Sequence, residues 1–326
     1  MGFLDLALTN LASPMVLCFV LGLAAGLSRS DLDVPDAIAK GLALFLMLSI
    51  GLQGGWKLAD SGANIGIAGH LLVAVLASFL MPVPAFFYLR RVAGLDRDTA
   101  AAVSAHYGSI SVVTFAIGSQ FVTAQGLGFE GHIVAMVALM ETPAIITGIL
   151  LARGRADAAS ETGEDRDHLM REVLVNGSVM LLVGGFLIGW AGGAEGKAAV
   201  APFFLDPFKG ALCLFLLDMG LVVARRSGGF KVLRPSVLVF GIAMPLIGGT
   251  LGAGLGTLMG LSLGGTTLFA VLCASASYIA VPAAMRLALP KANPALYVSL
   301  SLGVTFPFNV VIGIPTYFAL AERFAR

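Results

Sequence analysis

Long apolar stretches, each about as long as a membrane-crossing helix, follow one another along nearly the whole 326-residue sequence. A helix needs about 20 mostly apolar residues to cross the hydrocarbon core of a bilayer. Ten segments meet this requirement, with an uncertainty of a few residues at each end. They are 13–29, 36–54, 65–90, 99–124, 131–152, 173–192, 208–224, 234–260, 266–289 and 295–320. We therefore predict an all-α polytopic membrane protein with ten transmembrane helices.

The composition excludes the main alternatives to a membrane protein. Hydrophobic residues make up 58% of the chain and charged residues only 12%, whereas about a quarter of an ordinary soluble domain is charged. A soluble domain of this length could not bury so much apolar surface, and a disordered chain or a nucleic-acid-binding protein would need more charge. The formal net charge of +1 indicates no particular partner.

The distribution of Lys and Arg predicts the orientation of the chain. If the N-terminus lies outside the cell, only five of the 20 basic residues fall in outside connections, and the other fifteen fall inside. The five outside residues are Lys57, Lys197, Lys209, Arg323 and Arg326. Because cytoplasmic loops are enriched in Lys and Arg, we predict that both termini are outside and that the central loop is cytoplasmic.

The two halves of the chain resemble each other. The polar stretch 153–172 separates two sets of five apolar segments, and the motif Lys40-Gly41-Leu42 recurs as Lys209-Gly210-Ala211. An odd number of spans per repeat forces the second repeat to enter the membrane from the opposite face, as in many secondary transporters. We therefore expect a first five-helix repeat at 1–152, a cytoplasmic linker at 153–172 and an inverted second repeat at 173–326.

Two of the predicted spans contain polar residues that would break a helix. The fourth span packs Ser, His, Tyr and Gly together between Ser104 and Ser111, and the ninth contains Ser275, Ser277 and Pro282. Backbone groups freed in this way must line a cavity or pack against protein. The N-terminal end of a half-helix carries free N–H groups that suit an anion, and the C-terminal end carries carbonyl groups that suit a cation.

The fifth and tenth spans are interrupted at a similar depth. The fifth contains Glu141 followed by Thr142-Pro143, and the tenth contains Thr305 and Asn309 around Phe306-Pro307-Phe308. A carboxylate at this depth is costly and is typical of a transport pathway, so Glu141 is interpreted as a cation ligand or coupling group, or as a buried carboxylate bonded to a neighbouring helix. Thr305 and Asn309 could supply sodium ligands. Four interruptions at one depth indicate a single site near the midplane, whereas His70 is interpreted as a lone helix-packing residue.

The same interrupted spans resemble a known family. The resemblance is carried by HYGSISVVTF (106–115), METPAIITGILLA (140–152), ASASYIAVPAAMRLALPKANP (274–294) and SLGVTFPFNVVIGIP (301–315). On these segments the chain resembles the sodium-dependent bicarbonate transporters, as a divergent member outside the cyanobacterial type.

The resemblance implies a sodium-coupled symporter that brings bicarbonate into the cell across the inner membrane by alternating access. It implies a mobile core on a scaffold, assembly as a homotrimer, a possible PII-like cytoplasmic regulator, and no cofactor beyond Na⁺ as coupling ion. The residues expected to bind the anion are Gly108, Ser109, Ile110, Ser111, Ala274, Ser275, Ala276 and Ser277. The residues expected to bind sodium are Glu141, Thr305, Asn309 and Tyr107.

Alternative functions follow from positions where the sequence differs from the family pattern, and from the motifs that other functions would need. Tyr278 stands where the cyanobacterial pattern has an aspartate, so the substrate could be another small carboxylate or anion, coupled to sodium or to protons. An anion channel would show anion flux that is not coupled to a gradient of sodium or protons. An intramembrane enzyme would need a motif such as Gly-x-Ser-x-Gly or His-Glu-x-x-His, and the sequence contains neither.

Overall fold

The computed structural model describes residues 10–61, 65–157, 177–225, 233–278 and 280–325, which form helices with no β-strand among them. Within these described residues, six helical stretches are long and apolar enough to cross a membrane. They are Asp36–Asp60, Gly66–Arg91, Arg97–Ala124, His132–Arg153, Pro235–Leu258 and Pro294–Phe324. A pair of helices bent by 45°, Met180–Phe204 and Phe208–Arg225, would make a seventh. The prediction of an all-α membrane protein is thus confirmed, whereas the count of ten spans stays a prediction. Most of the predicted linker at 153–172 lies outside the described residues.

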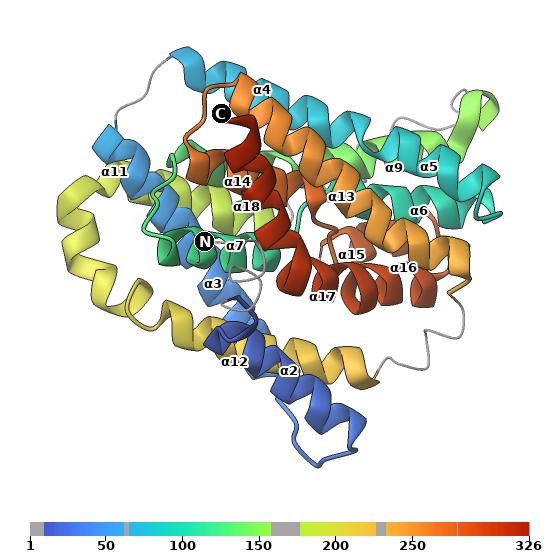
Figure 1. Cartoon of the computed structure of the whole chain (residues 1–326), viewed down its shortest axis with the longest axis horizontal. Helices are drawn as coiled ribbons and strands as arrows, with labels where there is room; N and C mark the ends of the chain where they lie inside the picture. The colour runs from blue at the N-terminus through green and yellow to red at the C-terminus, as the bar shows by residue number, and fades with distance from the viewer. Residues whose placement is uncertain (1–9, 62–64, 158–176, 226–232, 279, 326) are drawn as a thin grey trace.

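Four helices form one bundle, called here the panel: α2 (Pro14–Leu27), α3 (Asp36–Ser61), α11 (Gly177–Phe204) and α12 (Phe208–Arg225). Helix α11 runs down the left side of Figure 1, and α12 and α2 lie at the bottom. Helix α2 packs on α12, and α3 packs on α11.

Glycines set the distance between these paired helices. A Cβ atom added to Gly22 on α2 would overlap the carbonyl oxygen of Leu217 on α12. One added to Gly55 on α3 would overlap the carbonyl oxygen of Phe186 on α11. Small residues let the backbones of membrane helices approach closely, and van der Waals packing then holds the pair together.

The other helices form a second bundle, called here the core. Its N-terminal part consists of α4 (Ile65–Leu80), α5 (Pro82–Arg91), α6 (Arg97–Gly108), α7 (Val112–Ala124), α8 (His132–Leu139) and α9 (Glu141–Asp157). Its C-terminal part consists of α13 (Pro235–Leu258), α14 (Leu263–Ala274), α15 (Ala280–Ala288), α16 (Pro294–Leu300), η2 (Ser301–Thr305), α17 (Phe306–Phe308), η3 (Asn309–Gly313) and α18 (Ile314–Phe324).

Corresponding helices of the two parts make corresponding contacts. Helix α6 packs on α5 and α9, and α14 packs on α13 and α18. The two parts also contact each other, because α7 lies against α14 and α15 lies against α6. In the stretch Arg97–Ala124, the part that is apolar enough to cross a membrane is entirely buried inside the protein. By contrast, large apolar side chains such as Leu150, Ile188 and Leu251 are exposed, as expected for helices that face lipid.

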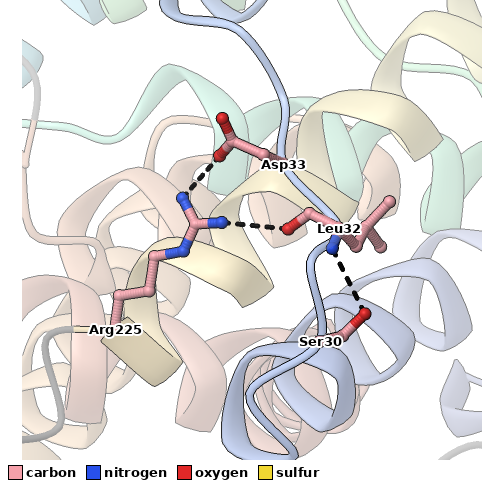
Figure 2. Close-up of polar contacts among 4 residues, drawn as sticks. All are labelled: Ser30, Leu32, Asp33 and Arg225. Atoms are coloured by element: carbon pink, nitrogen blue, oxygen red, sulfur yellow. Dashed lines mark hydrogen bonds and ion pairs between the residues drawn. The ribbon is translucent and has the colours of Figure 1, made fainter.

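The connection between α2 and α3 is attached to the end of α12 (Figure 2). The Arg225 guanidinium bonds the Asp33 carboxylate at 2.6 Å and donates to the carbonyl oxygen of Leu32 at 2.9 Å. The Leu32 N–H in turn donates to the Ser30 hydroxyl at 3.2 Å. Both ion-pair side chains are about half exposed, at 49% and 61%.

We expect Arg225→Ala to lower the free energy of unfolding by less than about 1 kcal/mol, because exposed ion pairs contribute little in water. Asp33→Asn should have a smaller effect, since Arg225 keeps its bond to Leu32. Thermal unfolding of both variants in detergent measures this. A loss of folded protein in either variant would contradict the assignment of this contact to the solvent-exposed surface.

Candidate functional site

Two helices of the core are interrupted where the sequence predicts a break. Helix α6 ends at Gly108 and α7 begins at Val112, while α14 ends at Ala274 and α15 begins at Ala280. The two interruptions contact each other directly. The Ser111 N–H donates to the Ser275 hydroxyl at 3.0 Å, and the Ser277 N–H donates to the carbonyl oxygen of His106 at 2.9 Å. The two predicted serine patches therefore lie together at one crossing of broken helices.

Serine side chains end and begin the half-helices at this crossing. Ser111 has an extended backbone and caps α7, because its hydroxyl accepts hydrogen bonds from the N–H and hydroxyl groups of Thr114 at 3.2 and 2.9 Å. The N–H groups of Val112 and Val113 belong to the first turn of α7. They have no acceptor within the helix, because no helical carbonyl group precedes them by one turn. The start of α7 thus combines a positive partial charge with free donors, the combination that binds anions.

The fifth predicted span is also interrupted, between α8 and α9, at Met140. Pro143 lacks the N–H group that would continue the helix, and serine side chains bond the carbonyl groups at the break. Ser78 donates to the carbonyl oxygen of Met140 at 2.7 Å, and Ser109 donates to that of Glu141 at 3.2 Å. The second of these bonds joins the Glu141 backbone to the first serine patch.

A small cavity lies at the crossing. Its lining residues are Met47, Ile110, Ser111, Val112, Glu141, Ser277 and Tyr278. The cavity measures about 10 Å³, which is room for about one water molecule. An anion of four heavy atoms therefore fits only after the surrounding groups separate. Met47 comes from the panel helix α3, so the cavity lies where the panel meets the core.

Thr305, expected as a sodium ligand, bonds two other elements. Its hydroxyl donates to the carbonyl oxygen of Gly241 on α13 at 2.7 Å. That hydroxyl has one hydrogen, so the Tyr107 hydroxyl is the donor in the 2.5 Å bond between the two side chains. Thr305 keeps one further lone pair, which is available to a cation.

Asn309 occupies a similar position one turn later. Its amide nitrogen donates to the carbonyl oxygen of Ala274, the last residue of α14, at 2.9 Å. Its amide oxygen accepts from the Tyr317 hydroxyl at 2.7 Å. Thr305 and Asn309 lie in the π-helical turns η2 and η3, which are frequent at functional sites. None of the described hydrogen bonds joins Glu141 to Tyr107, Thr305 or Asn309.

Sequence reasoning missed several residues at or near this site. Met47 lines the cavity, and Ser78 bonds the break beside Glu141, but an apolar pattern carries no signal for such long-range partners. The interpretation of His70 as a lone packing residue was wrong. The His70 ring donates from Nε2 to the carbonyl oxygen of Met259 at 3.0 Å, and its Nδ1 lies 3.0 Å from Nε2 of His132.

The two histidines line a separate hollow of about 470 Å³ at one end of the core, together with Lys57, Phe129 and Glu130. Lys57 lies over the Phe129 ring at 3.0 Å, and the Glu130 carboxylate accepts from the Ser262 N–H at 2.6 Å. Lys57 and Glu130 are thus engaged with protein, and Asp60 adds a further carboxylate to the lining of the hollow.

Comparison with known proteins places the chain in a family. A comparison with curated proteins finds no match. The profile described as the Na⁺-dependent bicarbonate transporter superfamily matches residues 14–322, which include every element of the crossing. Because the match covers nearly the whole chain, the protein belongs to the Na⁺-dependent bicarbonate transporter superfamily.

Proposed function

We propose that the protein carries bicarbonate together with Na⁺ into the cell, and that both bind at the crossing of the broken helices. One observation supports this most strongly: the two half-helix breaks bond each other beside a small cavity that is lined by Ser111, Ser277 and Glu141. The anion would bind the start of α7 and the serine patches, including the backbone of Gly108, Ile110, Ala274 and Ala276. Sodium would bind carbonyl and hydroxyl oxygens at Tyr107, Thr305 and Asn309, with Glu141 as a further ligand.

Coupling between the two ions has an electrostatic basis. Each ion lowers the cost of holding the other away from water, because opposite charges attract strongly where the dielectric constant is low. Each ion therefore raises the affinity for the other by the same factor. Symport follows if the protein changes its direction of access only when both ions or neither is bound.

We propose alternating access by motion of the core against the panel, in two inverted repeats at 1–152 and 173–326. The corresponding contacts of α6 with α5 and α9, and of α14 with α13 and α18, support such a repeat. The panel supports the repeat in the same way. If α2 and α3 of the first repeat correspond to α11 and α12 of the second, each helix packs on the counterpart of its neighbour, α2 on α12 and α3 on α11. A second small cavity between panel and core is lined only by apolar side chains, among them Leu46, Val113 and Phe215. The apolar side chains at this part of the seam form no hydrogen bonds that would resist sliding.

The remaining parts of the proposal concern the cell. The protein would lie in the inner membrane with both termini outside and the linker at 153–172 in the cytoplasm, and it would form a homotrimer. A PII-like regulator would bind from the cytoplasmic side. Sizing in detergent and accessibility of single-cysteine variants from each side of the membrane test these points.

The central experiment is uptake of labelled bicarbonate into proteoliposomes. An inward Na⁺ gradient is expected to drive accumulation, and dissipation of the gradient is expected to stop it. Accumulation driven by a proton gradient would replace Na⁺ as the coupling ion in this proposal. Accumulation of another small carboxylate would replace bicarbonate as the substrate. Flux that never exceeds the equilibrium distribution would identify an anion channel, and chemical conversion of the anion would identify an enzyme.

A sodium ligand at Thr305 predicts a specific defect. Thr305→Val removes a hydroxyl that accepts from Tyr107 and donates to Gly241, with little change in volume. We expect the Na⁺ concentration for half-maximal uptake to rise about tenfold, because a lost oxygen ligand weakens the cation site. Thr250→Val is the matched control, since the exposed Thr250 bonds only within its own helix. Equal Na⁺ dependence in the two variants would remove Thr305 from the sodium site.

A further inference from the structure

The carboxylate of Glu141 has an unusual environment. The residue is only 3% exposed, and its Oε2 atom has no hydrogen-bond partner among the residues that the structure describes. Burying a carboxylate oxygen without a donor is costly. Glu141 also lines the cavity at the crossing, so a donor carried by a bound molecule would satisfy this oxygen.

The other polar groups around the cavity are donors. The Ser111 hydroxyl accepts from Thr114, and the Ser277 hydroxyl lies 3.5 Å from the Val281 N–H, so each keeps its own hydrogen for a ligand. The Tyr278 hydroxyl lies near Ser111 and makes no well-formed hydrogen bond among the described residues. The cavity therefore combines three hydroxyl donors with one carboxylate acceptor.

This set of groups matches one feature that separates bicarbonate from similar anions. Bicarbonate is a planar anion with three oxygens, one of which carries a hydrogen. Nitrate has nearly the same shape and the same charge but carries no hydrogen. Hydroxyl donors and a helix start can bind either anion through its oxygens. An unpaired carboxylate repels both anions, but only bicarbonate offsets the repulsion by donating a hydrogen bond to it.

We propose that Oε2 of Glu141 accepts the hydrogen bond of the bicarbonate O–H group, and that Glu141 thereby selects bicarbonate over nitrate. The inference rests on the proposed binding of the anion at the crossing. A site built to bond a hydroxyl group rejects an analogue that lacks it, because the buried partner is left unpaired.

The test compares nitrate with bicarbonate in proteoliposomes under a fixed, saturating Na⁺ gradient. In the unaltered protein, nitrate is expected to inhibit uptake of labelled bicarbonate at least about tenfold more weakly than unlabelled bicarbonate does. Glu141→Gln removes the negative charge, leaves an amide oxygen that accepts more weakly than a carboxylate, and brings an NH₂ group that can donate to nitrate as well, so the preference for bicarbonate is expected to fall at least about tenfold. Tyr278→Phe is the control, because loss of a donor should weaken both anions by a similar factor.

The outcomes separate this inference from the proposed function. If Na⁺ drives bicarbonate uptake but Glu141→Gln leaves the ratio of the two anions unchanged and only raises the Na⁺ requirement, Glu141 is a sodium ligand alone and the inference fails. If Glu141→Gln does not fold, the unaltered protein still decides, since equal inhibition by nitrate and bicarbonate overturns the inference. If neither anion is taken up with sodium, the proposed function itself fails.

Discussion

Replacing Ser275 with alanine is expected to reduce Na⁺-driven bicarbonate uptake at least about tenfold. The Ser275 hydroxyl accepts from the Ser111 N–H across the two breaks and donates to the carbonyl oxygen of Leu272. Ser275 is 1% exposed, so its loss leaves a buried N–H group without a partner, at a cost of about 1–3 kcal/mol. The cap of α7 carries that N–H group, and the start of α7 would lose its fixed position.

Ser119→Ala provides the matched control for this prediction. Ser119 is also buried, but its hydroxyl only donates to the carbonyl oxygen of Ala116 in its own helix. Its removal leaves no backbone N–H group unpaired, and we expect uptake close to that of the unaltered protein. Uptake and thermal unfolding measured on both variants decide the matter. Similar uptake by the two variants would show that the bond between the breaks does not hold the site together.

The interruptions of the core helices could be predicted from the sequence because their causes are local. Ser111 is a residue type that caps helices, and Pro143 cannot continue a helix. Such residues are easy to recognise in an otherwise apolar segment, because the segment contains few other polar residues. The breaks at Gly108–Val112 and Ala274–Ala280 accordingly fall where expected. The family match over residues 14–322 confirms the resemblance carried by the same segments.

The partners of these residues could not be predicted, because they are distant in the sequence. Ser111 and Ser275 are separated by 164 positions, and Tyr107 and Thr305 by 198. Hydropathy periodicity assigns a face to a helix but names no neighbour. The sequence groups Glu141 with Thr305 and Asn309 by depth, and only the structure shows that Glu141 also lines the cavity beside the serine patches.

The panel illustrates the same limit. Gly51 and Gly55 on α3, like Gly185 and Gly189 on α11, have the four-residue spacing that is typical of closely packed membrane helices. That spacing is visible in the sequence. Which glycine-bearing helix packs on which is decided by the whole fold, and only the structure assigns α3 to α11.

The second large effect is expected at this contact. A Cβ atom on Gly55 would overlap the carbonyl oxygen of Phe186 and lie 2.5 Å from the backbone nitrogen of Trp190. Backbone atoms cannot turn aside as a side chain can, so Gly55→Ala must push α3 away from α11. Overpacking of this kind costs about 1–3 kcal/mol or more, and we expect a large drop in the unfolding temperature in detergent, with loss of folded protein for Gly55→Val.

Gly41 on the same helix separates packing from helix propensity. A Cβ atom there would have no neighbour within 4 Å, so Gly41→Ala is expected to leave stability unchanged or to raise it by about 0.5–1 kcal/mol, because alanine is the better helix former. The two substitutions add the same methyl group to the same helix, and only the distance to α11 differs. A drop in unfolding temperature of equal size in both variants would mean that α3 and α11 do not approach as closely as the glycines allow. A drop confined to Gly55→Ala would show that α3 and α11 pack backbone against backbone at Gly55, as the glycine contacts indicate.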